Sequence, residues 1–142
     1  MGYAGDVTPK ECWGILGTDK TAILIDVRTR AEWSFVGLPT LAKGMQPLVT
    51  HEWQAFPEMK VDDGFAADLS AKLQQQGANY GTQLCFLCRS GGRSLAAAKA
   101  LTTLGYEKAY NITGGFEGDP DENAHRGNRS GWKAEGLPWM QG

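Results

Sequence analysis

Short runs of apolar residues, separated by stretches with helical spacing, make up most of the chain. Residues 22–27 (AILIDV) and 82–87 (TQLCFL) are typical of strands buried on both faces of a parallel sheet. Residues 108–112 (KAYNI) predict another strand, and residues 45–50 predict a further one that Pro47 places at a sheet edge. The pattern therefore predicts four strands.

Three longer helices are expected, one before the first strand and two between later strands. Thr8, Pro9 and Glu11 form a capping box with proline at the first helical position, and this helix is expected to end at Gly17. A second helix opens at residues 62–64, and a third follows Cys88. Their apolar residues recur at intervals of three or four: Phe65, Leu69 and Leu73 in the second helix, and Leu95, Ala98, Leu101 and Leu104 in the third.

This order of elements predicts a single α/β domain across residues 1–142, with a mainly parallel central sheet flanked by helices. A chain of 142 residues is an ordinary length for one domain with one core. Residues 119–139 are expected to form a long late loop and a tail whose apolar residues, from Trp132 onward, pack on the body.

Composition and charge exclude several classes of function. A net charge of −2 gives no basic surface for a nucleic acid, and no apolar run approaches the ~20 residues of a membrane span. The N-terminus lacks the basic start and apolar block of a secretory signal. The three cysteines are scattered at positions 12, 85 and 88, which argues against a disulfide framework. We therefore expect a cytoplasmic protein.

The segment around Cys88 is the strongest candidate for chemistry. Cys88 ends a buried strand directly before a helix N-terminus, where unpaired amides and the helix dipole favour a thiolate. Arg89 and Arg93 flank the turn, and Gly91 and Gly92 allow consecutive amides to converge on one point. The sequence thus predicts an anion-cradling loop around a nucleophilic sulfur, without a metal or a cofactor.

Two other interpretations of Cys88 are weaker. Cys85 and Cys88 have the spacing of a redox pair, but side chains alternate along a strand, so these two should point to opposite faces. A cysteine phosphatase also uses a thiolate under a loop that an arginine closes. Its signature has five residues between cysteine and arginine, whereas this chain has four, and a shorter loop fits a single sulfur atom better than a phosphate.

Asp26 and Arg28 follow the strand at residues 22–27 and are supporting candidates. If this strand is parallel to the one before Cys88, both residues come to the active-site edge, where ligands bind in open α/β sheets. Asp26 as a cap of the following turn is an equally good alternative. Arg28 and Glu32 are four apart, a spacing that allows an ion pair across a short helix.

A basic cluster in the late loop leaves two interpretations open. Its members are His125, Arg126, Arg129 and Lys133. They either roof the site and select an anionic donor, or belong to a solvated loop beside Asp119, Asp121 and Glu122. The second interpretation is favoured.

Residues 88–94 (CRSGGRS) closely resemble the active-site loop of the rhodanese superfamily, of the form CRxGxRS. The likeness extends to residues 25–28 (IDVR) with Glu32, and to residues 104–106 (LGY) followed by 109–116 (AYNITGGF). The resemblance implies a rhodanese-like domain with a sheet of about five strands and thiosulfate-type sulfurtransferase activity.

The mechanism that this resemblance implies is covalent catalysis through a persulfide on Cys88. The thiolate takes sulfur from a donor such as thiosulfate, amides from Arg89 to Ser94 hold the persulfide, and cyanide, a thiol or a protein acceptor removes the sulfur. Arg93 closes the loop and is expected to brace it, which leaves Arg89 to contact the donor; Ser90, Gly91 and Gly92 complete the loop. A persulfide carrier without turnover and a sulfur-sensing interaction module remain alternatives.

Overall fold

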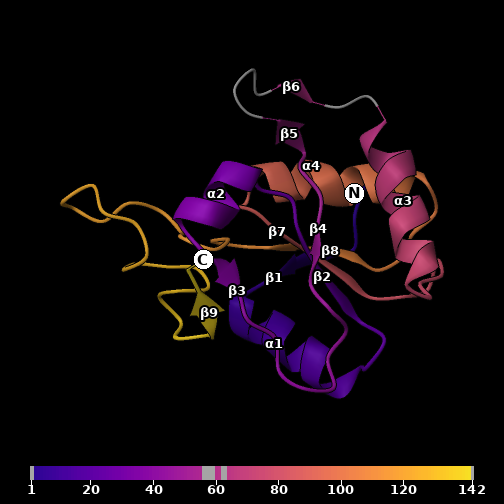
Figure 1. Ribbon diagram of the computed structural model, residues 1–142, viewed down its shortest axis with the longest axis horizontal. Helices are drawn as coiled ribbons and strands as arrows, with labels where there is room; N and C mark the ends of the chain where they lie inside the picture. Colours follow the sequence, from indigo (N-terminus) through magenta and orange to yellow (C-terminus); the bar gives the residue numbers. More distant parts are fainter. Residues whose placement is uncertain (1, 56–59, 62–63, 142) are drawn as a thin grey trace.

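The computed structural model describes residues 2–55, 60–61 and 64–141. Helices and strands alternate along it, as the sequence predicts (Figure 1). The helices are α1 (Pro9–Thr18), α2 (Arg30–Phe35), α3 (Phe65–Gln75) and α4 (Gly92–Thr103). The strands are β1 (Gly5–Val7), β2 (Ile23–Asp26), β3 (Leu38–Pro39), β4 (Val49–Thr50), β5 (Gln54–Ala55), β6 (Lys60–Val61), β7 (Leu84–Leu87), β8 (Ala109–Ile112) and β9 (Trp139–Met140).

The central sheet has five strands in the order β1-β8-β7-β2-β4, and every pair in it is parallel. The expected α/β class and mainly parallel sheet are therefore confirmed. All residues of β2 and β7 are buried, because helices cover both faces of these inner strands. The strand expected over residues 45–50 is the short edge strand β4, so its predicted place at an edge is also confirmed.

Two apolar clusters pack on opposite faces of the sheet. On one face, α3 and α4 contribute Phe65, Leu69, Leu73 and Leu101 beside Ile25 and Phe86. On the other face, α1 contributes Cys12 and Leu16, which pack with Leu24, Phe116 and Trp132. Figure 1 shows the same layers, with α1 on one side of the sheet and α3 and α4 on the other.

Most of the expected helix signals are present. Thr8 caps α1, and the capping box with Glu11 is complete. The acidic opening expected for α3, at Asp62 and Asp63, lies outside the described residues; Gly64 is the N-cap.

The apolar stripe expected along α4 is partly wrong. Ser94, Ala97, Ala98 and Leu101 face the sheet, whereas Leu95 is half-buried. Leu104 is exposed because it lies beyond the last helical residue, Thr103. Small side chains on the inner face allow α4 to approach the sheet closely.

Five strands have no counterpart in the sequence-based expectation: β1, β3, β5, β6 and β9. β1 adds a fifth strand to the central sheet beside β8, and the antiparallel pair β3–β9 connects the C-terminal tail to the segment after α2. β9 also lies beyond residues 108–112, which form the C-terminal strand among those that the sequence predicts. No helix within residues 2–55 and 64–141 is long and apolar enough to cross a membrane.

Candidate functional site

The turn between β7 and α4 places Cys88 at the carboxyl end of an inner strand. Gly91 has a φ of +118°, in the left-handed region that side chains disfavour, and it directly precedes the first helical residue, Gly92. Cys88 is buried, with 1% of its surface exposed. Arg89, Ser90 and Gly92 are exposed above it.

The sulfur of Cys88 has two polar neighbours. The backbone N–H of Gly91 donates to Sγ at 3.1 Å, and Oγ of the buried Ser94 lies 3.2 Å from Sγ. The sequence predicts several converging amides; among the described loop amides, the Gly91 amide is the one within hydrogen-bond distance of the sulfur. The site thus has one amide donor and one hydroxyl at the sulfur.

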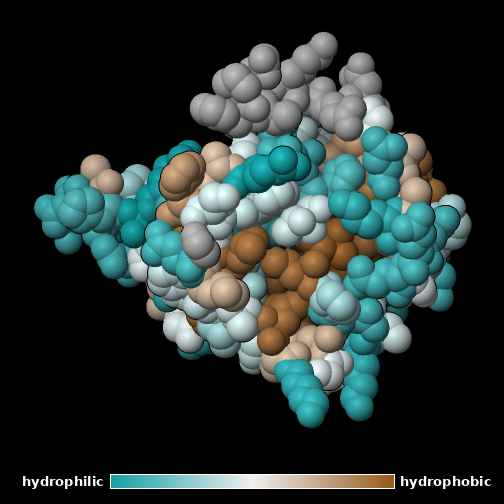
Figure 2. All heavy atoms as spheres, viewed as in Figure 1, coloured by the Kyte–Doolittle hydropathy of each residue, from teal (hydrophilic) through white to brown (hydrophobic). Residues whose placement is uncertain are grey.

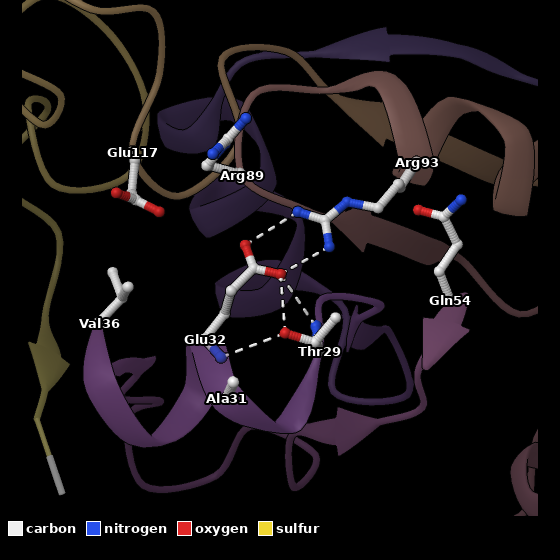
Figure 3. A pocket seen from close by; sticks show the side chains of 8 residues that line it. All are labelled: Thr29, Ala31, Glu32, Val36, Gln54, Arg89, Arg93 and Glu117. Atoms are coloured by element: carbon white, nitrogen blue, oxygen red, sulfur yellow. Dashed lines mark hydrogen bonds and ion pairs between the residues drawn. The ribbon is translucent and has the colours of Figure 1, made fainter. Parts of the chain in front are cut away.

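Arg93 turns toward α2 and pairs with Glu32. Its two outer nitrogens lie 2.6 and 2.9 Å from the two carboxylate oxygens, a bidentate geometry (Figure 3). Glu32 also accepts the backbone N–H of Thr29 and completes the capping box of α2. Burial opposes ionisation, but the hydrogen bonds from Arg93 and Thr29 outweigh it and lower the pKa of Glu32 to about 2. Burial also disfavours the charged form of Arg93, yet the bonds to Glu32 raise its pKa above the usual value.

Arg89 has different surroundings. Its guanidinium makes no hydrogen bond or ion pair with any residue that the structure describes, and it faces a pocket of about 550 Å³ (Figure 3). The residues that line the pocket are Thr29, Ala31, Glu32, Val36, Gln54, Arg89, Arg93 and Glu117. Both loop arginines thus border the same cavity, one paired and one open.

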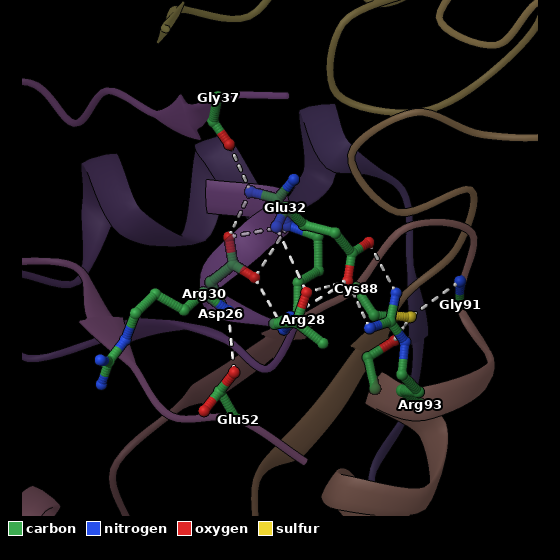
Figure 4. Close-up of polar contacts among 11 residues, drawn as sticks. Asp26, Arg28, Arg30, Glu32, Gly37, Glu52, Cys88, Gly91 and Arg93 are labelled. Atoms are coloured by element: carbon green, nitrogen blue, oxygen red, sulfur yellow. Dashed lines mark hydrogen bonds and ion pairs between the residues drawn. The ribbon is translucent and has the colours of Figure 1, made fainter. Parts of the chain in front are cut away.

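Asp26 and Arg28 form a fully buried ion pair at the end of β2 (Figure 4). Asp26 also accepts the backbone N–H of Arg28 at 3.0 Å, and Arg28 donates to the carbonyl of Gly37 at 2.7 Å. Asp26 therefore braces the turn after β2, the second of its two expected roles. These contacts hold the segment that leads from β2 into α2 and β3.

The prediction of an ion pair between Arg28 and Glu32 is wrong. A four-residue spacing brings side chains together only within a helix, and α2 begins at Arg30, after Arg28. Arg28 instead folds back onto Asp26, and Glu32 binds Arg93.

Phe116 and Glu117 brace the loop from the other side, a role that the sequence does not predict. The backbone N–H of Phe116 donates to the carbonyl of Cys88 at 2.8 Å, and the next amide, of Glu117, donates to the carbonyl of Arg89 at 3.0 Å. The guanidinium of Arg28 lies 4.2 Å from the centre of the Phe116 ring. The paired glycines of residues 109–116 were the signal available in the sequence.

Cys85 lies on the opposite face of the sheet from Cys88, as alternation along the strand predicts. Cys85 belongs to the cluster under α1, whereas Cys88 belongs to the cluster under α3 and α4. Both are free thiols. A hydrogen bond with Cys85, together with burial, raises the pKa of Cys12 well above its usual value.

The late basic cluster is divided in the structure. Residues 119–131 project from the body, and Figure 2 shows this projection as hydrophilic. Arg126 donates to the carbonyl of Gly118, and Arg129 pairs with Glu122 within the same loop. Lys133 instead lies over the Trp139 ring at 3.9 Å, where burial lowers its pKa. The contacts of Arg126 and Arg129 thus match the favoured interpretation of a solvated loop.

Comparison with known proteins gives a consistent result. The sequence profile of the rhodanese-like domain matches residues 8–119. An uncharacterized protein of Rickettsia conorii is 34% identical over 135 residues, which cover 95% of this chain and 96% of the relative. The thiosulfate sulfurtransferase GlpE of Tolumonas auensis is 49% identical over 37 residues, which cover 26% of this chain and 35% of the relative. The crystal structure of Rv0390 from M. tuberculosis superimposes with a TM-score of 0.87 and 43% identity, and the match covers 99% of both chains.

Proposed function

This chain belongs to the rhodanese-like domain family, and we propose on that premise that it transfers sulfane sulfur through a persulfide on Cys88. The observation that carries the proposal is the placement of the Cys88 sulfur, at the end of an inner strand and 3.1 Å from the Gly91 amide. An amide donor in this position stabilises negative charge on sulfur.

The proposed reaction has two steps, each an attack of sulfur or carbon on sulfur. The Cys88 thiolate first attacks the outer sulfur of thiosulfate; a bond forms between the two sulfurs, the S–S bond of thiosulfate breaks, and sulfite leaves with the electron pair. A thiolate or cyanide then attacks the terminal sulfur of the persulfide. The Cys88 thiolate leaves, and the acceptor carries the sulfur away as a persulfide or as thiocyanate.

We propose that Arg89 recruits the donor and that Arg93 holds the loop in place. The support is their unequal pairing. Arg89 has no partner among the residues that the structure describes and can bind an anion, whereas the bidentate pair of Arg93 with Glu32 is already satisfied. Cys88 is 1% exposed, so the outer sulfur of the donor reaches it when the exposed side chains of Arg89 and Ser90 move aside.

The experiment is intact-mass spectrometry after incubation with thiosulfate. We expect the mass of one added sulfur atom, mapped to the peptide of Cys88, and no addition in Cys88→Ser. Cys85→Ala is the matched control, because Cys85 lies on the opposite face of the sheet, and it should still take up the sulfur. Absence of the added sulfur from the unaltered protein, with both thiosulfate and an organic persulfide, would contradict the proposal.

Turnover with cyanide distinguishes an enzyme from a carrier. An enzyme forms many equivalents of thiocyanate per chain, whereas a carrier releases about one equivalent and then waits for its protein acceptor. We propose the enzyme, because the pocket beside the loop is large enough for a small acceptor. We further propose a reducing compartment such as the cytoplasm, since Cys12, Cys85 and Cys88 are all free thiols.

A further inference from the structure

Three hydrogen bonds link Cys88 to Asp6, an acidic residue of β1. The Cys88 sulfur lies 3.2 Å from Oγ of Ser94, and this hydroxyl donates to Oδ1 of Asn111 at 2.6 Å. The amide nitrogen of Asn111 donates to Oδ1 of Asp6 at 3.2 Å. Asp6 and Asn111 are direct neighbours across the parallel pair β1–β8, so the sheet register brings them together.

The direction of these bonds follows from counting protons. An ionised carboxylate can only accept, so Asp6 requires the NH₂ group of Asn111, and the carbonyl oxygen of Asn111 must then face Ser94. A serine hydroxyl has one proton, and here that proton goes to Asn111. What Ser94 presents to Cys88 is therefore a lone pair, which can accept the proton of a thiol but cannot stabilise a thiolate.

We propose that Asp6, acting through Asn111, is a positioning residue that makes Ser94 a hydrogen-bond acceptor and so keeps a proton on the resting sulfur of Cys88. Ser94 can then stabilise the thiolate only if its hydroxyl rotates toward the sulfur. That rotation leaves the carbonyl oxygen of Asn111 without its donor in a buried place. A residue of the edge strand β1 thus influences the protonation of Cys88, which follows β7 two strands away.

Other charged groups around the sulfur act in addition to this chain. Arg93 of α4 is close enough to interact with both Cys88 and Asp26, and it is itself paired with Glu32 of α2. At the other end, the hydroxyl of Tyr3 donates to Asp6 at 2.9 Å. All of these groups remain in the variants below, so differences between the variants report on the chain from Asp6 to Ser94.

The experiment is a pH titration of the Cys88 thiolate, followed by its ultraviolet absorbance, with Cys88→Ser as the blank. No sulfur donor is present, so the result is independent of whether the protein transfers sulfur. Ser94→Ala removes the acceptor of the thiol proton, and we expect the titration midpoint to fall. If Ser94 instead donates to the thiolate, the same substitution raises the midpoint. A rise or no change therefore overturns the proposal.

Asp6→Asn tests the remote residue and, because Asp6 is exposed and the change is isosteric, it should fold. The new amide can donate to the Asn111 carbonyl, so Asn111 can turn its NH₂ group to Ser94 and release the serine proton to the sulfur. We expect the midpoint to fall by about one pH unit, a tenfold change in ionisation.

The double variant Ser94→Ala/Asp6→Asn separates this orientation effect from the loss of a negative charge. Removing the charge of Asp6 acts on Cys88 whether or not Ser94 is present, whereas the orientation effect needs the hydroxyl. We expect Asp6→Asn to shift the midpoint much less in the Ser94→Ala background than alone. Equal shifts in both backgrounds, or no shift in either, would overturn the proposal.

Discussion

Both outer nitrogens of the Arg93 guanidinium donate hydrogen bonds to Glu32. The guanidinium of Arg89 instead faces the pocket and has no partner among the described residues. The two residues are four positions apart and carry the same charge, with Arg89 in the loop and Arg93 in the first turn of α4. Their neighbours differ because α2 presents Glu32 to the base of the loop and presents no acid to its tip. This difference assigns bracing to one arginine and recruitment to the other.

The first prediction compares Arg89→Ala with Arg93→Ala. Loss of Arg89 removes a charge-assisted contact to the donor, so we expect half-saturation by thiosulfate at a roughly tenfold higher concentration and stability within about 0.5 kcal/mol. Loss of Arg93 leaves Glu32 half-buried without its cation and should reduce the free energy of unfolding by about 1–3 kcal/mol. Steady-state kinetics and urea unfolding measure both; similar behaviour of the two variants would refute this division of roles.

The second prediction concerns Glu32 and acid. Its pKa is about 2 in the folded protein and 4.5 without the fold, so the folded state binds fewer protons. The stabilisation is complete above about pH 5 and is lost as pH falls toward the folded pKa. We expect Glu32 to contribute about 1–2 kcal/mol to this acid dependence after solvent screening. Urea unfolding between neutral and acidic pH should show a flatter profile for Glu32→Gln than for the unaltered protein.

At the scale of elements, the loop between β7 and α4 is held by the turn after β8. Gly115 has a φ of +58°, and a Cβ there would overlap the carbonyl of Cys88 and lie 2.6 Å from the carbonyl oxygen of Arg89. Close approach of two backbones, rather than φ alone, thus requires glycine at this position. The geometry of the nucleophile depends on a residue that never touches the sulfur.

The third prediction uses this close approach. Gly115→Ala combines a left-handed φ with overlap, and we expect it to cost about 3 kcal/mol or more and to abolish persulfide formation. Gly136→Ala is the matched control: its φ is +77°, and a Cβ there has no neighbour within 4 Å. The control should lose only about 1–2 kcal/mol and keep its persulfide. Thermal unfolding and intact mass compare them, and equal losses would contradict the role of overlap.

The sequence predicts those elements whose causes are local. The capping box of α1 lies within four residues, and the buried runs of β2 and β7 are continuous, so both could be predicted. β1 contains a single strongly apolar residue, Val7, and is a strand only because β8 pairs with it more than 100 residues later. Glu32 and Arg93 are likewise 61 residues apart, and no spacing rule connects them.

At the scale of the whole molecule, the C-terminal tail completes the core under one face of the sheet. Trp132 is fully buried against Trp13, at 5.8 Å between ring centres, and its Nε1 donates to the carbonyl of Pro138 at 2.7 Å. β9 then pairs with β3 beyond this point. The sequence indicates the apolar tail, but its partner strand β3 has only two residues and gives no periodic signal.

The fourth prediction measures how much the tail contributes. Trp132→Ala removes a fully buried side chain and should lower the free energy of unfolding by about 3–5 kcal/mol. Phe35→Ala is the exposed aromatic control, since 77% of Phe35 is exposed, and it should stay within about 0.5 kcal/mol. Urea unfolding measures both. If Trp132→Ala lowers the free energy of unfolding by less than about 1 kcal/mol, the tail does not contribute to the stability of the core, and the prediction is wrong.

The outermost strands of the central sheet are its shortest, with three residues in β1 and two in β4. An open strand edge is a template on which another chain can add by backbone pairing, and short edges offer few bonds for such addition. The longer, wholly buried strands β2 and β7 would be the hazardous ones, and they are enclosed by neighbours on both sides. We therefore expect this strand order to limit edge-to-edge pairing between copies of the chain, even in concentrated solution.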